Sequence, residues 1–292
     1  MTHEQEMILS LLREKKYSSV KALVIDMNEV DIAEVFEELY EREEPELLLM
    51  LFRLLPKEIA AETFAYIDSD VQESLIVALS DRELAYIIDD MSMDDYVDLV
   101  EEMPANVVKR LLSNSSAENR SLINEYLQYP EDSAGSIMTN EYVYLKKRLT
   151  VHQAFDVIRK NGVDKETIYT CYVISTERKL EGVVTIRELL LADPSAEIGD
   201  IMSTNVIYVH TLDDKEEVAK IFSRYDMLSL PVVDKEERLV GIITVDDAVD
   251  VMQDENTEDF EKMAGMAPSE DTYLKTPVWK LAKNRIVWLL VL

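Results

Sequence analysis

The strongest constraint on the fold is a twelve-residue repeat within the first 129 residues. The apolar positions of this repeat are Leu55, Ile67, Leu79, Met91 and Met103. Each is followed by a residue that suits the start of a helix, namely Pro56, Asp68, Ser80, Ser92 or Pro104. One repeat has room for a single helix of about ten residues, which is only marginally stable in isolation. The repeat therefore predicts short helices stacked as an all-α superhelical domain over residues 1–129.

A second repeat, about 60 residues long, follows the first. The stretch that begins "SIMTNEYVYL" recurs as "DIMSTNVIYV", so that Met138 aligns with Met202 and Gly182 with Gly241. Each copy is typical of a β-branched strand, an amphipathic helix, two further strands and a second helix. We therefore expect a tandem pair of α+β units that pack together as one body.

The charge of the chain limits its function. It has 59 acidic and 30 basic residues, a net charge of −29, and residues 1–129 alone contain 29 acidic and 11 basic residues. Nucleic-acid binding needs a basic surface, so we expect no nucleic-acid partner. The surplus of acidic residues favours cations or basic partners.

The single cysteine, Cys171, excludes an intramolecular disulfide and is compatible with a reducing cytosol. We find no signal-peptide pattern at the N-terminus.

Two stretches of the chain place acidic residues at a spacing that destabilises a helix. Residues 245–261 contain eight acidic residues and no lysine or arginine. Like charges four residues apart on a helix destabilise it by a few tenths of a kcal/mol per pair, roughly. In this stretch the spacing of four joins Asp246, Asp250, Asp254 and Glu258, and in "MSMDDYVDLVEEM" it joins Asp94 and Asp98. Mg²⁺ is a hard cation that proteins hold with one or two carboxylates while it keeps several waters. Such faces are suited to loosely held divalent cations such as Mg²⁺ or Ca²⁺.

The last residues have a different character. The apolar run "RIVWLLVL" is preceded by basic and aromatic residues. Eight residues cannot cross a bilayer, which takes about 20. The pattern is nevertheless typical of the start of a membrane helix with its interfacial flank. The alternative is an amphipathic C-terminal helix packed on the body of the protein.

The second repeat carries the pattern of cystathionine-β-synthase (CBS) domains, which it resembles. The junction "YPEDSAGSIMT", directly after an acidic helical solenoid, resembles the cytosolic part of the MgtE family of bacterial magnesium transporter-channels. This resemblance covers essentially the whole chain. It implies a helical N domain (1–129), CBS domain 1 (130–199), CBS domain 2 (200–253), a connecting helix (254–274) and the start of the first transmembrane helix (275–292).

The resemblance also implies a mechanism. Magnesium ions would bridge acidic faces and favour the closed state of a membrane pore, and loss of magnesium would open it. The implied metal-contacting residues are Asp94, Asp98, Asp247, Asp250, Glu62, Asp226, Glu216, Glu255, Glu258 and Asp259. Further implications are a homodimer formed through the CBS domains, a membrane pore domain as partner, and a place on the cytoplasmic side of a bacterial cell membrane. For each residue the alternative is an ordinary solvated acid on a helix surface.

CBS pairs often bind adenosine nucleotides through a Thr/Ser-x-x-Asp motif. The second unit has "TVDD" and the first has "TIRE", in which Arg187 and Glu188 are the candidate contacts to ATP. An alternative function is therefore a nucleotide-sensing regulator that acts on a protein partner. We find no phosphate-binding glycine loop, GxSxG motif or Cys–His pair, so we do not expect an enzyme. A calcium buffer would use the same acidic residues.

Overall fold

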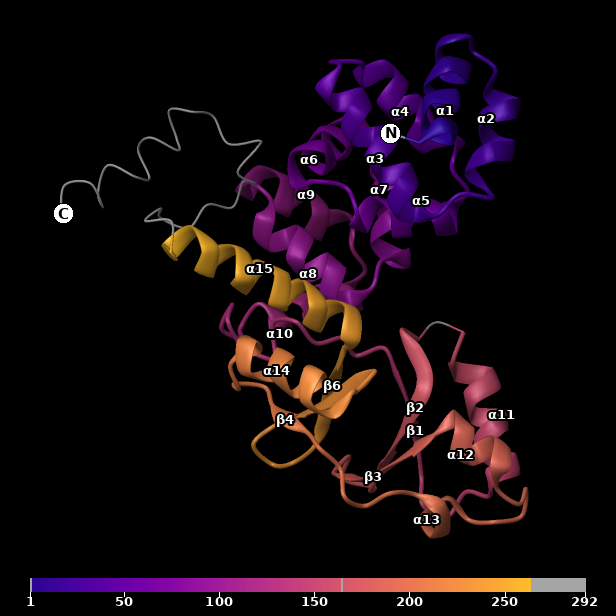
Figure 1. Ribbon diagram of the computed structural model, residues 1–292, viewed down its shortest axis with the longest axis vertical. Helices are drawn as coiled ribbons and strands as arrows, with labels where there is room; N and C mark the ends of the chain where they lie inside the picture. Colours follow the sequence, from indigo (N-terminus) through magenta and orange to yellow (C-terminus); the bar gives the residue numbers. More distant parts are fainter. Residues whose placement is uncertain (1, 164, 264–292) are drawn as a thin grey trace, which may run out of the picture. The chain divides into compact units, whose positions relative to one another are not determined.

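The chain divides after Gln128 into two compact units, each described here by itself. A computed structural model describes residues 2–163 and 165–263 (Figure 1). We call residues up to Gln128 the helical unit and residues from Tyr129 onward the α+β unit.

The described part of the helical unit consists of ten helices, mostly of eight to thirteen residues. They are α1 (His3–Arg13), α2 (Tyr17–Val24), α3 (Glu29–Glu41), α4 (Pro45–Leu54), α5 (Lys57–Ala65), α6 (Ser69–Ala78), α7 (Asp81–Asp90), α8 (Met93–Glu102), α9 (Ala105–Asn114) and α10 (Ala117–Tyr126). Helices α5 to α9 each fill one twelve-residue repeat, as the sequence predicted.

The repeat residues have the two roles that were expected of them. All five apolar positions are buried, with Met91 8% and Leu79 3% exposed. The residue that follows each of them is the N-cap of the next helix. Ser80 forms a full capping box with Glu83, which satisfies helix-end amide groups that would otherwise lack partners. One local rule, a buried residue followed by a cap, thus starts five successive helices.

Packing between alternate helices builds the superhelix. Helix α3 packs on α5, α5 on α7, and α7 on α9. Edge-to-face contacts of Phe52 with Phe36 and Phe64, each with ring centroids 6.1 Å apart, join α3, α4 and α5. Such short helices gain their stability from this burial, which is worth roughly 1.5–3 kcal/mol for each large apolar side chain. The prediction of an all-α superhelical domain is confirmed.

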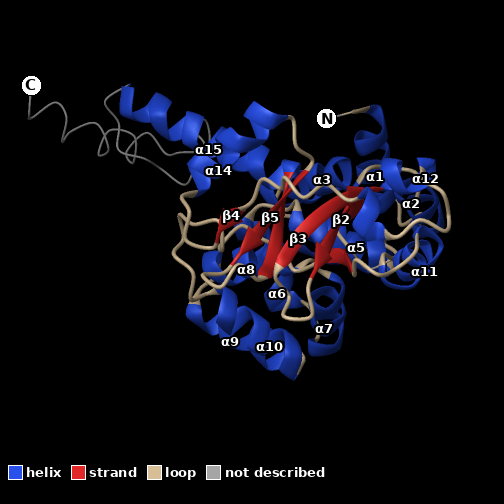
Figure 2. Ribbon diagram, turned by 90° about the horizontal axis from the view of Figure 1, so that it is seen from below, coloured by secondary structure: helices blue, strands red, loops and turns tan. Residues whose placement is uncertain are grey.

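The α+β unit contains the second repeat. Its first half has β1 (Tyr142–Leu145), α11 (Val151–Asn161), β2 (Thr167–Ile174), β3 (Leu180–Thr185) and α12 (Ile186–Leu191). Its second half has α13 (Ile198–Ile201), β4 (Val209–His210), α14 (Lys215–Tyr225), β5 (Ser229–Val233), β6 (Leu239–Thr244) and α15 (Val245–Met263). Each half has a three-stranded sheet, in which the first pair of strands is parallel and the second antiparallel (Figure 2). The predicted tandem α+β fold is confirmed.

Each half of this unit completes the other. The backbone at Thr139, which leads into the first half, exchanges two 2.8 Å hydrogen bonds with Ile242 on β6 of the second half. Ser203, which leads into the second half, pairs in the same way with Val183 on β3 of the first. A Cβ atom on Gly241 would meet Met138 Sδ at 2.7 Å, and one on Gly182 would meet Met202 Sδ at 2.8 Å. The Met and Gly positions that align in the repeat therefore pack crosswise, which makes the two halves one body.

Helix α15 runs without a break from the end of β6 through the expected start of the connecting helix at residue 254. The expected connecting segment 264–274 and the expected membrane segment 275–292 lie outside the described residues. In the part of the chain that the structure describes, no helix is both long and apolar enough to span a membrane.

Candidate cation-binding site

Helix α8 gathers carboxylates on a short surface, which we call the α8 face (Asp94, Asp98 and their neighbours). The helix begins at Ser92, whose hydroxyl accepts the Asp95 N–H at 3.3 Å and donates to Asp95 Oδ2 at 2.7 Å. Asp94 and Asp98 lie one turn apart on the same side, as predicted, and Asp94 is only 8% exposed. Helix α8 contains no lysine or arginine. The local sequence thus both begins helix α8 and places several carboxylates on it.

The electrostatic consequence is visible at Asp98. Although the Asp98 residue is exposed at the surface, exclusion of water by surrounding protein raises the pKa of its carboxyl, and the charges of nearby carboxylates raise it further, to about 7. The carboxylates responsible are Asp94, Asp95, Glu101 and Glu102. At neutral pH a proton therefore partly neutralises this face. A divalent cation would supply the same neutralisation with more charge.

The N-terminal half of α15 has a similar row of acids, which we call the α15 face (Asp246, Asp250 and Asp254). Burial raises the pKa of Asp250, and the charges of Asp254 and Asp246 raise it further. The predicted spacing of four therefore does bring these carboxylates together along one side. Asp247 is placed differently, because its Oδ2 accepts the Thr244 N–H at 3.1 Å and the Thr244 O–H at 2.5 Å. That carboxylate helps to begin α15 as well as adding to its charge.

A third group forms where α14 packs along α15 (Figures 1 and 2), and we call it the Glu216 cluster (Glu216, Glu255, Glu258 and Asp259). Burial raises the pKa of Glu255, followed by the charges of Glu216 and Glu258, while Lys215 and Lys262 oppose the shift. Glu216 of α14 thus lies close enough to Glu255 of α15 to raise its pKa, although the two residues are far apart in the sequence. The structure brings Glu216, Glu255 and Glu258 together, and Asp259 acts on the neighbouring Lys262.

The Glu216 cluster also has basic partners that the run of acids did not reveal. Lys220 Nζ lies 2.7 Å from Glu216 Oε1, and Lys262 Nζ lies 2.6 Å from Glu258 Oε1. The negative charges of Glu258, Asp259 and Glu255 raise the pKa of Lys262 after its hydrogen bond to Glu258. The acids of residues 245–261 therefore do have bases near them at this cluster, although that stretch itself contains none. These bases are Lys215 of α14 and Lys262 in the last turn of α15.

Glu62 and Asp226 lie in different units, and each has a local role. On α5, burial and the neighbouring carboxyl of Glu29, within hydrogen-bonding reach, raise the pKa of Glu62. Sequence reasoning missed Glu29, since it lies 33 positions earlier in another helix and only packing brings it near. Asp226 caps α14 in the left-handed region, with φ 51°, and donates its N–H to Phe222 O. Aspartate is among the few residues that tolerate this conformation.

The two nucleotide motifs form helix caps. Thr185 and Glu188 make a capping box at the start of α12, in which Glu188 Oε2 accepts the Thr185 N–H at 2.7 Å and its O–H at 2.8 Å. Thr244 and Asp247 repeat the arrangement at α15. Arg187 is exposed on the first turn of α12. The same Thr-x-x-acid pattern that suggested a ribose contact is thus also a general helix-start signal.

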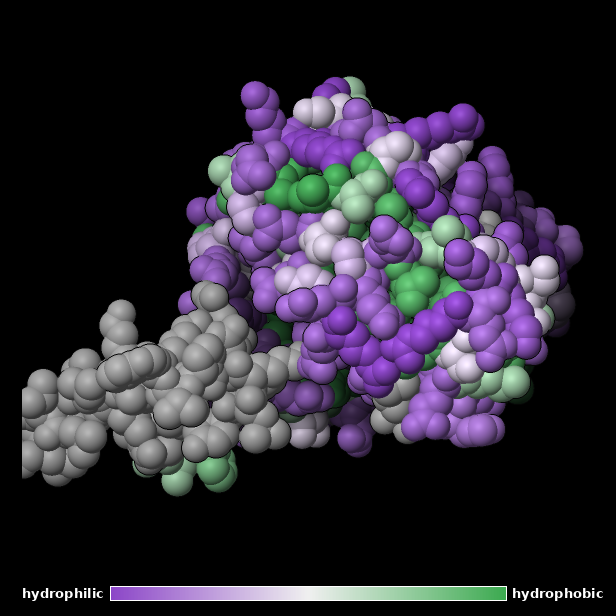
Figure 3. All heavy atoms as spheres, turned by 90° about the horizontal axis from the view of Figure 1, so that it is seen from above, coloured by the Kyte–Doolittle hydropathy of each residue, from purple (hydrophilic) through white to green (hydrophobic). Residues whose placement is uncertain are grey.

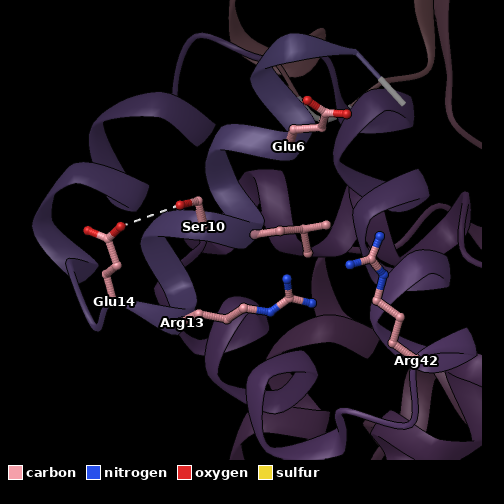
Figure 4. A pocket seen from close by; sticks show the side chains of 6 residues that line it. Glu6, Ser10, Arg13, Glu14 and Arg42 are labelled. Atoms are coloured by element: carbon pink, nitrogen blue, oxygen red, sulfur yellow. Dashed lines mark hydrogen bonds between the residues drawn. The ribbon is translucent and has the colours of Figure 1, made fainter.

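A pocket on the helical unit is lined by Leu9 and polar residues of α1, with Arg42 opposite (Figure 4). Two guanidinium groups face it, but both are engaged. Arg13 binds Glu44 at 3.0 Å, and Arg42 binds Glu38. Glu6 and Glu14 also line the pocket. Its charge therefore does not favour an anion such as a nucleotide phosphate.

The donor chemistry of the acidic faces is suited to magnesium, because carboxylate oxygens are its usual protein ligands. Within residues 2–163 and 165–263, no three His, Cys, Asp or Glu side chains converge closely enough to form a metal centre.

Hydrophilic side chains cover most of the face of the molecule drawn in Figure 3, with hydrophobic areas between them.

Comparison with known proteins identifies the family. The profile of the MgtE intracellular N domain matches residues 27–132, and the CBS domain profile matches residues 134–195 and 198–254. The magnesium transporter MgtE of Thermus thermophilus is 33% identical over 99% of this chain, and that of Bacillus subtilis is 32% identical over 98%. A crystal structure of the soluble part of a magnesium transporter, 30% identical, superposes with a TM-score of 0.79 over 86% of this chain and 98% of that one. The chain belongs to the MgtE family.

A second MgtE structure adds a ligand. The cytosolic domain of the Mg²⁺ channel MgtE in complex with ATP is 33% identical and superposes with a TM-score of 0.78, covering 85% of this chain and 99% of that one. This chain spans 65% and 62% of the lengths of the Thermus and Bacillus transporters. Its described residues thus have the fold of an MgtE cytosolic domain.

Proposed function

We propose that this chain is the magnesium-sensing, gating region of a magnesium transporter or channel. The observation that carries the proposal is the mutual repulsion of carboxylates on α8, which raises the pKa of Asp98 to about 7 after the effect of burial. It occurs in a chain whose relatives are magnesium transporters over nearly its whole length. We therefore infer that Mg²⁺ is the cation that binds these faces.

The physical basis is linkage between cation binding and conformation. Two acidic surfaces repel each other over about one Debye length, roughly 8 Å at physiological salt. A divalent ion between them makes the interaction attractive. A conformation in which the surfaces approach then binds magnesium better, so rising magnesium increases its population. Several weak sites that fill together give a steep response without a tight site.

We assign the bridges to three groups of residues. Asp94 and Asp98 of the α8 face would hold ions opposite Asp247 and Asp250. Glu62 and Asp226 would form a second bridge between the units. The third group would be Glu216, Glu255, Glu258 and Asp259 at the Glu216 cluster. When bound, magnesium would supply positive charge, and one or two carboxylates would hold each ion while it keeps several of its waters.

The remaining parts of the proposal concern partners and place. The chain would form a homodimer through its CBS domains and act on a membrane pore domain of the same transporter. It would lie on the cytoplasmic side of a bacterial cell membrane. High magnesium would favour the closed pore, and low magnesium would let repulsion between the acidic faces open it. In this role the chain regulates and does not catalyse.

A small-angle scattering titration of the 292-residue chain tests the proposal. Magnesium is added at constant ionic strength set with potassium, so that general screening stays unchanged. We expect a magnesium-specific decrease in the radius of gyration. An unchanged radius, relative to the potassium control, would contradict the proposal and leave the acids as ordinary surface charge.

Nucleotide sensing is the second candidate function. It is favoured by the MgtE cytosolic domain that was crystallised with ATP at 33% identity to this chain. Arg187 would contact the phosphates and Glu188 the ribose, at the cost of its bonds to Thr185. Calorimetry with ATP should show binding that Arg187→Ala weakens about tenfold, since a charge-assisted contact is lost. Glu188→Gln keeps an acceptor for the Thr185 cap and serves to separate helix stability from nucleotide contact.

A further inference from the structure

Ammonium groups of the chain itself lie on the carboxylates of the Glu216 cluster. Lys220 contacts Glu216 at 2.7 Å and Glu217 at 2.8 Å on α14. Lys262 contacts Glu258 at 2.6 Å on α15. Because α14 packs along α15, Lys215 and Lys262 also act electrostatically on Glu255. Lysine ammonium groups of the protein thus already neutralise part of the negative charge of the Glu216 cluster.

The positions of these lysines distinguish the Glu216 cluster from the other acidic faces. Neither α8 nor residues 245–254 of α15, which carry the α8 face and the α15 face, contain a lysine or arginine in their own sequence. Lys220 follows Glu216 by four residues and Lys262 follows Glu258 by four. Glutamate four residues before lysine is the favourable orientation of such a pair on a helix. Each ammonium is therefore held over a particular carboxylate by its own helix.

We propose that Lys220 and Lys262 are tethered counter-cations that hold the Glu216 cluster until a divalent cation displaces them. They would raise the magnesium concentration at which the cluster fills and would exclude monovalent cations from it. The inference rests on the proposed function, because it assigns a regulating role to residues beside one of the proposed magnesium sites.

Charge explains the selectivity. Potassium has the same charge as an ammonium group but makes no hydrogen bond to the carboxylate, so it gains nothing by replacing the lysine. Magnesium has twice the charge, and its Coulomb attraction to each carboxylate is correspondingly twice as large at equal distance. The lysine pairs are solvent-exposed and hence weak, so a divalent ion can break them. The displaced ammonium groups can turn into solvent on their flexible stems and remain charged.

The test is a magnesium titration of the full chain, followed residue by residue in amide NMR spectra. The test variant is Lys220→Met with Lys262→Met, since methionine is also a good helix former. The control variant is Lys235→Met with Lys160→Met, which removes two exposed lysines elsewhere in the α+β unit and gives the same net charge. The readouts are the magnesium concentrations at half-shift for the amides of Glu216, Glu255 and Glu258.

We expect the half-shift concentration to fall about threefold to tenfold in the test variant and to stay unchanged in the control. Raising potassium from about 0.05 to about 0.3 M should also increase the midpoint by a larger factor in the test variant than in the wild type. If the wild type responds and the test variant matches it within about twofold, the lysines have no such role and the magnesium site stands. If the wild-type amides do not respond to magnesium, the proposed site at this cluster is itself wrong, and this inference fails with it.

Discussion

The α8 face and the Glu216 cluster contain the same kind of side chain and have opposite electrostatic surroundings. On α8 the charges of neighbouring carboxylates add to the effect of burial and bring the pKa of Asp98 to about 7. At the Glu216 cluster, Lys220 and Lys262 pair with two of the acids. The first group is neutralised in part by protons and the second by ammonium groups. The comparison teaches that the number of acids does not set the behaviour of an acidic helix surface, because its neighbours decide which cation it holds.

The largest expected effect is on the α8 face. Asp94→Asn with Asp98→Asn removes both candidate ligands, so we expect the magnesium midpoint of compaction, measured by small-angle scattering, to rise at least about tenfold. Glu118→Gln with Glu125→Gln removes two exposed acids of α10 and gives the same net charge. This control should compact at the wild-type magnesium concentration. Equal midpoints for the two variants would show that only overall charge matters.

The next effect concerns protons. Magnesium must compete with a proton at Asp98, so lowering the pH from about 8 to about 6 should weaken the magnesium response of the α8 face about tenfold. Amide NMR titrations at both pH values measure this directly. The Glu216 cluster should respond less, because lysines that remain charged neutralise it in both conditions. An equal pH dependence at both places would remove the distinction between them.

The pH dependence of the free energy of unfolding should also differ between the α8 face and the Glu216 cluster. The pKa of Asp98 is about 7 in the folded chain and about 4 when unfolded, so the folded state binds more protons between these values. Stability without magnesium should therefore fall as the pH rises from about 4 to about 7 and then level off. At about pH 8, Asp98→Asn should be more stable than wild type by about 1 kcal/mol, after allowance for solvent screening of a partly exposed group.

Thermal unfolding at several pH values measures this gain, which should shrink to a few tenths of a kcal/mol, roughly, at about pH 4, where Asp98 is protonated in the folded chain and about half protonated in the unfolded one. Glu216→Gln serves as the matched variant, and it should gain nothing at any pH because Glu216 pairs with Lys220. A gain for Glu216→Gln as large as that for Asp98→Asn would mean that the lysines do not neutralise their cluster.

The smallest expected effect is on the lysine pairs as stabilising contacts. Lys262→Met should change the Tm by no more than about 2 °C, because exposed ion pairs on a helix contribute little. Differential scanning calorimetry in the absence of magnesium measures this. A larger loss of stability would indicate a structural role for Lys262, and its proposed competition with magnesium would then need a variant that keeps the helix intact.

Interactions between neighbouring residues could be predicted because they repeat along the chain. The twelve-residue period located five helix starts, since a buried residue and a cap are adjacent in sequence. The aligned Met and Gly positions correctly indicated a tandem fold. The Thr185–Glu188 motif has the spacing of a capping box, so this role too can be predicted from the sequence alone, beside the nucleotide contact that the resemblance implies.

The sequence by itself determined the fold class, the helix boundaries of the repeats and the surplus of acid, because local spacing and composition are sufficient for these. Only the tertiary structure decided which charges meet. Packing of α14 on α15 placed Lys215 near Glu255, and packing of α3 and α5 placed Glu29 beside Glu62. It also made each Met of the repeat pack on the glycine of the other half. The electrostatic energy of two charges depends on the distance between them in space, and residues far apart in the sequence come close together only when the chain is folded.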